Sequence, residues 1–203
     1  MSLEILTALS IYAFVSSITP GPNNLMLMAS GANYGFRRTI PHMLGVGIGF
    51  MVMLMLIGLG LKQLFDTFPL SHQILKVVSI TYLVYLAYKI AVSSAPSQEK
   101  KPGDNGSNPL TFFQAALFQW VNPKAWTMAL TAVTVYSPTA NIDSILLIAI
   151  IFGLINLPSV SVWTLAGQGL SRFLTNEIRL RTFNISMALL LLLSMYPVLA
   201  PQQ

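Results

Sequence analysis

Residues 5–36 read ILTALSIYAFVSSITPGPNNLMLMASGANYGF, a stretch of 32 residues that contains no Asp, Glu, Lys or Arg. A helix needs about 20 apolar residues to cross the hydrocarbon of a bilayer, so this stretch is longer than one span requires. Its middle is interrupted by Thr-Pro-Gly-Pro-Asn-Asn at 19–24. Two prolines and a glycine remove backbone hydrogen bonds and clash with the preceding turn. The stretch therefore predicts a membrane helix that is broken near its middle.

The composition of the whole chain also indicates that lipid is its main solvent. Only 8% of the 203 residues are charged and 54% are apolar, with a mean hydropathy of +0.68. Soluble proteins carry about 25% charged residues, and a soluble domain of this size has too little interior to hide so much apolar surface. Continuous apolar runs such as 51–57 (MVMLMLI) lack the alternation of a membrane β-barrel. The chain is therefore predicted to be an all-α integral membrane protein.

Six membrane helices are predicted from the long charge-free intervals and from a less obvious span that carries Lys76 and Lys89 near its two ends. They are expected at residues 3–28, 40–61, 71–91, 111–135, 144–167 and 182–199. A polar segment rich in Pro, Gly and Ser at 93–110 reads as a linker between a first half, 1–92, and a second half, 111–203, of a single transporter domain. Because each half has an odd number of helices, the first helix of the second half enters the membrane from the side opposite to the first helix of the first half. This layout is typical of the 3+3 inverted-topology repeats of secondary transporters.

The positive charges of the connections predict the orientation in the membrane. Eight Lys and Arg residues lie in or beside the first, third and fifth connections, whereas the second and fourth hold one between them. The positive-inside rule then places the first group in the cytoplasm and both termini outside. The net charge of +5 is therefore a topology signal. It does not indicate a nucleic-acid partner, because the basic residues are spread over short connections without interleaved aromatic residues.

A second break is predicted at Asn122-Pro123-Lys124, about midway along the fourth helix. One proline alone would favour a simple kink, but two matched motifs favour two broken helices. Unwound backbone at membrane depth is tolerated only where protein buries it or where it lines a water-filled cavity. Half-helices that begin after Pro22 and Pro123 would present positive ends to a carboxylate, and freed carbonyls could hold an ammonium group. The two breaks together predict a site for a zwitterion.

Lys124 is the strongest single candidate for a substrate-binding residue, because a charged residue near the membrane midplane usually belongs to a substrate site or pathway. No Asp or Glu lies in the interior of any predicted span. Its partner is therefore expected to be backbone carbonyls, water or an anionic group of the substrate; the alternative is a lysine that reaches the headgroups from a shifted span. The predicted substrate-binding residues are Thr19, Pro20, Gly21, Pro22, Asn23, Asn24, Asn122, Pro123 and Lys124.

Three further features of the sequence predict helix packing or argue against a metal site and an enzyme. Gly45 and Gly49 are predicted to pack closely against the broken first helix or against a second copy in a homodimer. The chain has no Cys, and His42 and His72 lie far apart without a ligand-spaced partner. Each histidine is interpreted as a membrane-interface residue, and no metal or other cofactor is expected. No Gly-x-Ser-x-Gly stretch occurs, so an enzyme is not expected.

Several motifs together resemble the LysE/RhtB family of amino-acid exporters, over nearly the whole chain. They are the glycines of the second helix, Thr-Pro-Gly-Pro-Asn at 19–23, Gly-Phe-Arg at 35–37, Tyr-Leu-Ala-Tyr-Lys at 85–89 and Asn-Pro-Lys-Ala at 122–125. The cysteine/O-acetylserine exporter branch is the most similar, through Pro-Asn-Asn at 22–24, Gly-Phe-Arg at 35–37, Gly-Phe at 49–50 and Trp-Thr-Leu-Ala-Gly at 163–167. The resemblance implies a secondary transporter of the bacterial inner membrane. Such a protein exports small neutral amino acids, with protons as the coupling ion.

One departure from the family pattern leaves the coupling open. Some members carry an Asp in the second or fifth helix, where this chain has Phe50 and Asn156-Leu-Pro-Ser159. His42, Lys124 or facilitated diffusion could stand in place of that carboxylate. The alternatives for function are a homoserine/threonine or lysine exporter of the same family, or a passive small-solute channel. A dibasic substrate such as lysine is disfavoured, because its second charge would find no carboxylate deep in the spans.

Overall fold

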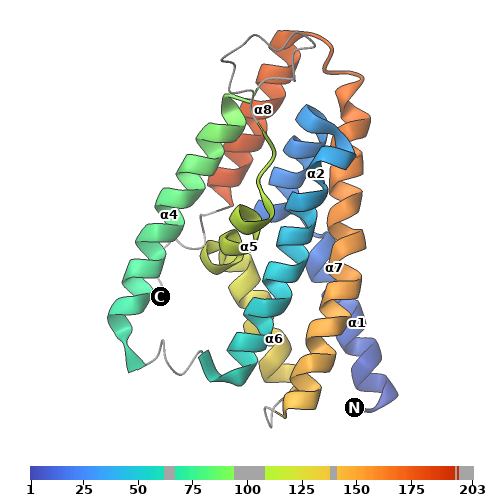
Figure 1. Cartoon of the computed structure of the whole chain (residues 1–203), viewed down its shortest axis with the longest axis vertical. Coiled ribbons are helices and arrows are strands. Elements are labelled where there is room, and N and C mark those ends of the chain that lie inside the picture. The colour runs from blue at the N-terminus through green and yellow to red at the C-terminus, as the bar shows by residue number, and fades with distance from the viewer. Residues whose placement is uncertain (62–66, 94–107, 138–140, 195, 197–203) are drawn as a thin grey trace.

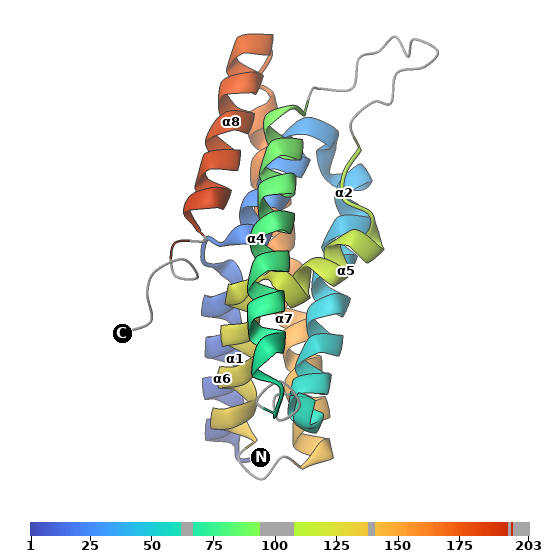
Figure 2. The ribbon, with the colours of Figure 1, turned by 90° about the vertical axis from the view of Figure 1, so that its left-hand side faces the viewer.

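The computed structural model describes residues 1–61, 67–93, 108–137, 141–194 and 196, and within these ranges all regular structure is helical. Figures 1 and 2 show an elongated bundle with α2 and α7 running along its length. Most of the predicted linker at 93–110 and the predicted end of the last helix at 199 lie outside the described residues. The elements are α1 (Leu3–Ile18), α2 (Pro22–Leu56), a π-helical turn η1 (Ile57–Leu61), α4 (Pro69–Ala91), α5 (Phe112–Val121), α6 (Pro123–Tyr136), α7 (Ile142–Ser171) and α8 (Glu177–Leu193).

Three stretches of the described chain are long and apolar enough to cross a membrane: Pro22–Leu61, Gln73–Ala91 and Ile142–Ser171. The helices α1 and α5 have only 16 and 10 residues. Each is followed, after a short break, by a second helix. They reach membrane length only when α1 is joined to the start of α2 and α5 is joined to α6.

The long helix α2 consists of two helical stretches that meet at Gly35, whose φ is 77° and ψ is 169°. The chain runs toward one end of the bundle, turns there and comes back (Figure 1). The first connection, between the helices predicted at 3–28 and 40–61, is therefore much shorter than those bounds imply, because helical residues continue to Tyr34 and resume at Phe36. Glycine reaches positive φ at little cost, so a single residue makes the turn.

The other predicted helices agree more closely with the structure. The bounds of α4 and α7 lie within four residues of the predicted 71–91 and 144–167. The last helix, α8, begins at Glu177, five residues before the predicted start. Asn176 explains the early start, because its side chain accepts a hydrogen bond from the Ile178 amide at 2.8 Å and caps the helix.

Two apolar clusters lie on either side of the helix breaks. One joins α1, α6, the start of α7 and the end of α2, around Phe50 and Phe152. The other joins α4, α5, α8 and both helical stretches of α2, around Leu86 and Phe118. Polar side chains at the breaks, such as Asn23 and Gln119, bind one another instead.

The glycines of α2 pack against α5. A Cβ at Gly49 would lie 2.6 Å from the Ala116 Cα, and one at Gly45 would meet the Phe112 carbonyl oxygen. Small residues permit such a close approach of two backbones. The face formed by Gly45 and Gly49 is therefore used within the chain, and its partner is the first part of the predicted fourth helix rather than the first helix.

Candidate functional site at the two helix breaks

The two helix breaks meet inside the bundle. The first lies between the end of α1 at Ile18 and the start of α2 at Pro22, and the second lies between α5 and α6 at Asn122. Lys124, at the start of α6, joins them. Its Nζ donates to the Thr19 carbonyl at 2.7 Å, the Thr19 hydroxyl at 2.9 Å and the Pro20 carbonyl at 3.3 Å.

These contacts are electrostatically favourable. The carbonyls at the carboxyl end of α1 have no amide partner in the next turn and carry partial negative charge. The half-buried Lys124 ammonium lies directly on them. The sequence allows backbone carbonyls, water or a substrate anion as partners of this lysine. In the structure its partners include backbone carbonyls.

Side chains from two other elements hold the remaining carbonyls of the α1 end. The Asn24 Nδ2 donates to the carbonyls of Ser17 and Thr19, both at 2.8 Å. The Trp163 Nε1, from α7, donates to the Ile18 carbonyl at 2.9 Å. Buried backbone groups need such partners, so the unwound segment is held by hydrogen bonds from α2, α6 and α7.

A reciprocal amide pair ties α2 to α5 beside the breaks. The Asn23 Nδ2 donates to the Gln119 Oε1 at 2.8 Å, and the Gln119 Nε2 donates to the Asn23 Oδ1 at 3.1 Å. Gln119 is fully buried and donates also to the Ala115 carbonyl at 2.9 Å. Asn122, in contrast, acts locally: its Oδ1 accepts from the Lys124 amide at 3.1 Å and caps α6.

A small cavity lies among these side chains. Gly21, Asn23, Gln119, Lys124 and Asn156 are among its lining residues, and its volume is about 20 Å³. That volume suits one water molecule and is too small for an amino acid. The Asn156 Nδ2 donates to the Ser17 Oγ at 3.1 Å, whereas its buried Oδ1 accepts no hydrogen bond from the described residues. The cavity is therefore lined by one free acceptor and by the lysine that holds the α1 carbonyls.

The structure brings most of the predicted residues to this cavity. Thr19 and Pro20 contribute their carbonyls to Lys124 while their side chains are exposed, and Pro22 and Pro123 begin the two half-helices. The residues that line the cavity itself are Gly21, Asn23, Asn24, Asn122 and Lys124.

Sequence reasoning missed four residues of the site: Ser17, Gln119, Asn156 and Trp163. Two of them carry a signal that could have identified them. Gln119 and Asn156 are amides inside charge-free apolar intervals, and polar residues within membrane spans usually serve a site or bind another helix. Ser17 carries no comparable signal, because serine is common in such spans. Trp163 belongs to the Trp-Thr-Leu-Ala-Gly motif at 163–167, which indicated the family branch and not a role in the site.

His42 is buried inside the protein. It is 1% exposed, and neither ring nitrogen has a hydrogen-bond partner among the described residues. The interface interpretation of His42 stays a prediction, and the side chain of His72 lies outside the described part of the structure. Among the described residues no group of three or more potential metal ligands occurs.

Comparison with known proteins supports the motif resemblance. A family model described as LysE type translocator matches residues 14–194, which include both helix breaks. The cysteine/O-acetylserine efflux protein of Salmonella typhimurium strain LT2 is 29% identical over 193 residues, which are 94% of this chain and 95% of the relative. The protein of the same description in Escherichia coli strain K12 is 28% identical over the same shares. No solved structure matches the chain.

Proposed function

The chain belongs to the LysE type translocator family, and on this premise we propose that it is a secondary transporter that exports small neutral amino acids. Cysteine and O-acetylserine are the first candidates, because relatives that match 94% of the chain are named for their efflux. The apolar helices and the bacterial relatives support a location in the inner membrane. The amide-lined cavity, with one cation and no acidic residue among its lining residues, suits a compact zwitterion.

The proposed topology has six spans in two inverted halves. The first half comprises α1 with the start of α2, the rest of α2, and α4. The second comprises α5 with α6, then α7, then α8. Each half begins with a broken helix, and the two breaks meet at Lys124, as expected for repeats whose substrate site lies at their interface. Under the positive-inside rule both termini are outside the cytoplasm.

The Lys124 contacts carry the proposed mechanism. Without substrate, the ammonium of Lys124 holds the carbonyls of Thr19 and Pro20. An amino acid would offer its carboxylate to Lys124, and its own ammonium would take the carbonyls that Lys124 leaves. The free Asn156 Oδ1 is a further acceptor for that ammonium. Both charges of the zwitterion are then matched, and no buried charge is left unpaired.

Transport requires the cavity to open and close. At about 20 Å³ it must widen before an amino acid can enter, so the half-helices at the breaks must separate on one side at a time. This behaviour is that of alternating access rather than of an open pore. Protons are the proposed coupling ion, which would let the protein export against a substrate gradient.

The first test is efflux from preloaded cells or proteoliposomes. Labelled cysteine, O-acetylserine, threonine, homoserine and lysine are compared with and without an uncoupler. Selective efflux that the uncoupler stops is the expected result. Efflux that is unaffected by the uncoupler and never proceeds against the substrate concentration gradient would instead indicate a passive channel.

Lys124→Met tests the site. Loss of one charge-assisted contact of about 1.5–3 kcal/mol lowers the efflux rate by about tenfold or more, while the protein still inserts in the membrane. Lys76→Met is the matched control, because Lys76 is an exposed lysine of α4 and its loss should leave efflux unchanged. Normal efflux by Lys124→Met would contradict the proposed mechanism.

A further inference from the structure

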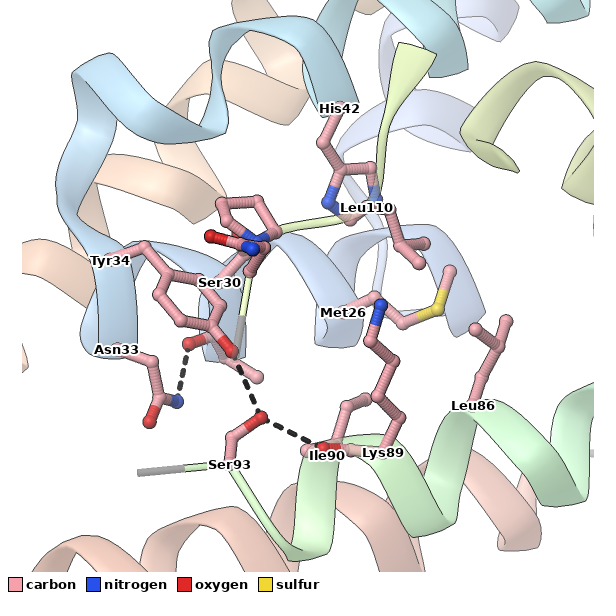
Figure 3. Close-up of a pocket in the computed structure, with 13 residues that line it drawn as sticks. Met26, Ser30, Asn33, Tyr34, His42, Leu86, Lys89, Ile90, Ser93 and Leu110 are labelled. Carbon is pink, nitrogen blue, oxygen red and sulfur yellow. Dashed lines mark hydrogen bonds between the residues drawn. The ribbon is translucent and has the colours of Figure 1, made fainter. Parts of the chain in front are cut away.

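A second cavity lies near the turn at Gly35, between α2, α4 and the segment that leads into α5. Figure 3 shows its lining side chains, among them Tyr34 and His42 from α2 and Lys89 from α4. Its volume is about 40 Å³. The mechanism proposed above uses none of these residues, so the cavity needs a separate explanation.

The hydroxyl hydrogens in this cavity are already engaged. Ser93 donates to the Lys89 carbonyl at 2.8 Å, so Tyr34 is the donor in its 3.1 Å bond with the Ser93 Oγ. The Thr39 hydroxyl donates to a backbone carbonyl, so Ser30 is the donor in the 2.9 Å bond between these two residues. None of these hydroxyls has a hydrogen left for a ligand.

The amide in the cavity wall is engaged as well. The Asn33 Nδ2 donates to the Asn184 Oδ1 at 2.7 Å, and the Asn184 Nδ2 donates back at 3.0 Å. Asn33 also donates to the Ala29 carbonyl at 2.8 Å. Both hydrogens of the Asn33 amide are therefore used within the protein.

Besides the Nδ2 of the exposed Asn108, two groups among the described lining residues keep free hydrogen-bonding capacity. His42 is 1% exposed with neither ring nitrogen bonded, and the Lys89 ammonium donates to no residue in the described part of the chain. In Figure 3 these two side chains extend toward one another across the cavity. A buried imidazole without a partner is unfavourable, and a ligand that accepts a hydrogen bond from its N–H would relieve that cost.

The charge of the cavity selects an anionic group. Among the described residues that line it, Lys89 is the only charged one, and none is acidic. Arg38 adds a second cation at the rim, where it donates to the Asn108 Oδ1 at 2.9 Å. A half-buried ammonium without a counter-charge attracts a carboxylate, with which it forms a short, strong hydrogen bond.

We propose that this cavity binds the carboxylate of the amino acid before the molecule reaches Lys124, with Lys89 and His42 as the groups that hold it. The inference rests on the proposed function. It also rests on the position of the cavity: Met26 of α2 lines it, and Asn23, which lines the central cavity, is three residues away, about 4.5 Å along the helix axis. Under the proposed topology, this cavity lies on the cytoplasmic side and acts as a loading site.

The test uses the absence of cysteine from the chain. Ile90 is partly buried and lines the cavity, so Ile90→Cys in the full chain provides a single reporter thiol. Its rate of labelling by N-ethylmaleimide is measured on protein purified in detergent. O-acetylserine should slow the labelling in proportion to its occupancy. The control compound is 2-aminoethyl acetate, which lacks only the carboxylate and should give no protection.

Variants in the Ile90→Cys background identify the groups that bind. Lys89→Gln should raise the concentration of O-acetylserine that gives half protection by about tenfold, the value of one charge-assisted hydrogen bond. Lys89→Arg should retain most of the protection, and Lys76→Gln, on the exposed face of the same helix, should leave it unchanged. If Lys89→Gln does not fold, His42→Leu carries the same expectation.

Three results would overturn the proposal: no protection by O-acetylserine, equal protection by 2-aminoethyl acetate, or full protection in Lys89→Gln and His42→Leu. Protection by phosphatidylglycerol instead of O-acetylserine would assign the cavity to a lipid phosphate and would also overturn it. The two proposals fail separately. Efflux without protection would retain the transporter and remove the loading site, whereas protection without efflux would retain the carboxylate site and remove the exporter.

Discussion

Lys124 is bound by peptide carbonyls rather than by a carboxylate. Its ammonium contacts the Thr19 carbonyl, the Thr19 hydroxyl and the Pro20 carbonyl, which belong to the unpaired end of α1. A buried ion pair would hold both partners firmly, and breaking it would leave an unpaired charge. Contacts with partial charges are weaker. This arrangement suits a lysine that has to exchange its partner for a substrate.

Gly21 provides the space for this lysine. Its φ of −178° is open to any residue, but a Cβ there would lie 2.7 Å from the Lys124 Cδ and 3.2 Å from its Nζ. Because a lysine side chain can move aside, Gly21→Ala should displace Lys124 more than it destabilises the fold. We expect efflux to fall by about tenfold, since part of a charge-assisted contact is lost, with a small change in the thermal midpoint.

The control for Gly21→Ala is Gly169→Ala. Gly169 lies in α7, and a Cβ there would have no heavy atom within 4 Å. Efflux and the thermal midpoint in detergent are measured for both variants. Wild-type efflux by Gly21→Ala would show that the observed position of Lys124 is not needed for transport.

Among the helices, the two broken pairs complete each other across the bundle. The end of α1 is capped by side chains from α2, α6 and α7, while Asn23 and Gln119 join α2 to α5. A helix end in a membrane has no bulk water to satisfy its carbonyls. Each break therefore depends on the rest of the bundle, and a movement at one break changes the hydrogen bonds of the other.

The turn inside α2 depends on one glycine. Gly35 has a φ of 77° and a ψ of 169°, a combination that is essentially restricted to glycine. A Cβ there would meet only the Gln168 Oε1 at 3.8 Å, so the cost of Gly35→Ala is conformational and not steric. We expect a loss of about 1–3 kcal/mol in the free energy of unfolding, seen as a lower thermal midpoint in detergent.

Gly35→Asn should give no rescue. Asparagine tolerates the left-handed helical region, where ψ is near 47°, but not the extended ψ found here. Gly169→Ala again serves as the neutral helix control. An unchanged midpoint for Gly35→Ala would mean that the α2 turn tolerates an ordinary residue.

For the whole molecule, the proposed topology assigns each end of the bundle to one side of the membrane. Single cysteines in the cysteine-free chain report that side. Cysteines replacing Ser2 and Asn141, both exposed, should react with a membrane-impermeant maleimide in intact cells. Cysteines replacing Val92 and Phe173, each 57% exposed, should react only after the cells are permeabilised.

The two outer cysteines and the two inner cysteines serve as controls for each other. Reaction of all four cysteines in permeabilised cells shows that each thiol is accessible. The reverse pattern would contradict the predicted orientation. Different sides for Ser2 and Asn141 would contradict the six-span arrangement, because the proposed topology separates these two residues by four crossings.

The amino-acid sequence alone predicts that this is a helical membrane protein and where its helices break. Charge-free intervals of membrane length act through the local cost of burying charge in lipid. Prolines such as Pro22 and Pro123 act through their own backbone. Lys124 can be identified in the same way, because the free-energy cost of burying its charge depends only on its depth in the predicted span. These signals are local, and the structure shows a break at both positions.

Which polar groups contact one another depends on how the helices pack in three dimensions. Lys124 and Thr19 are 105 residues apart, and Asn23 and Gln119 are 96 apart; nothing in the apolar pattern of either helix specifies the facing one. From the sequence His42 is interpreted as an ordinary interface residue. In the structure it lies in a cavity that is also lined by α4 and by the segment before α5. Hydrophobicity in lipid sets how deep a residue lies, whereas the pairing of polar groups depends on which helix faces are packed together.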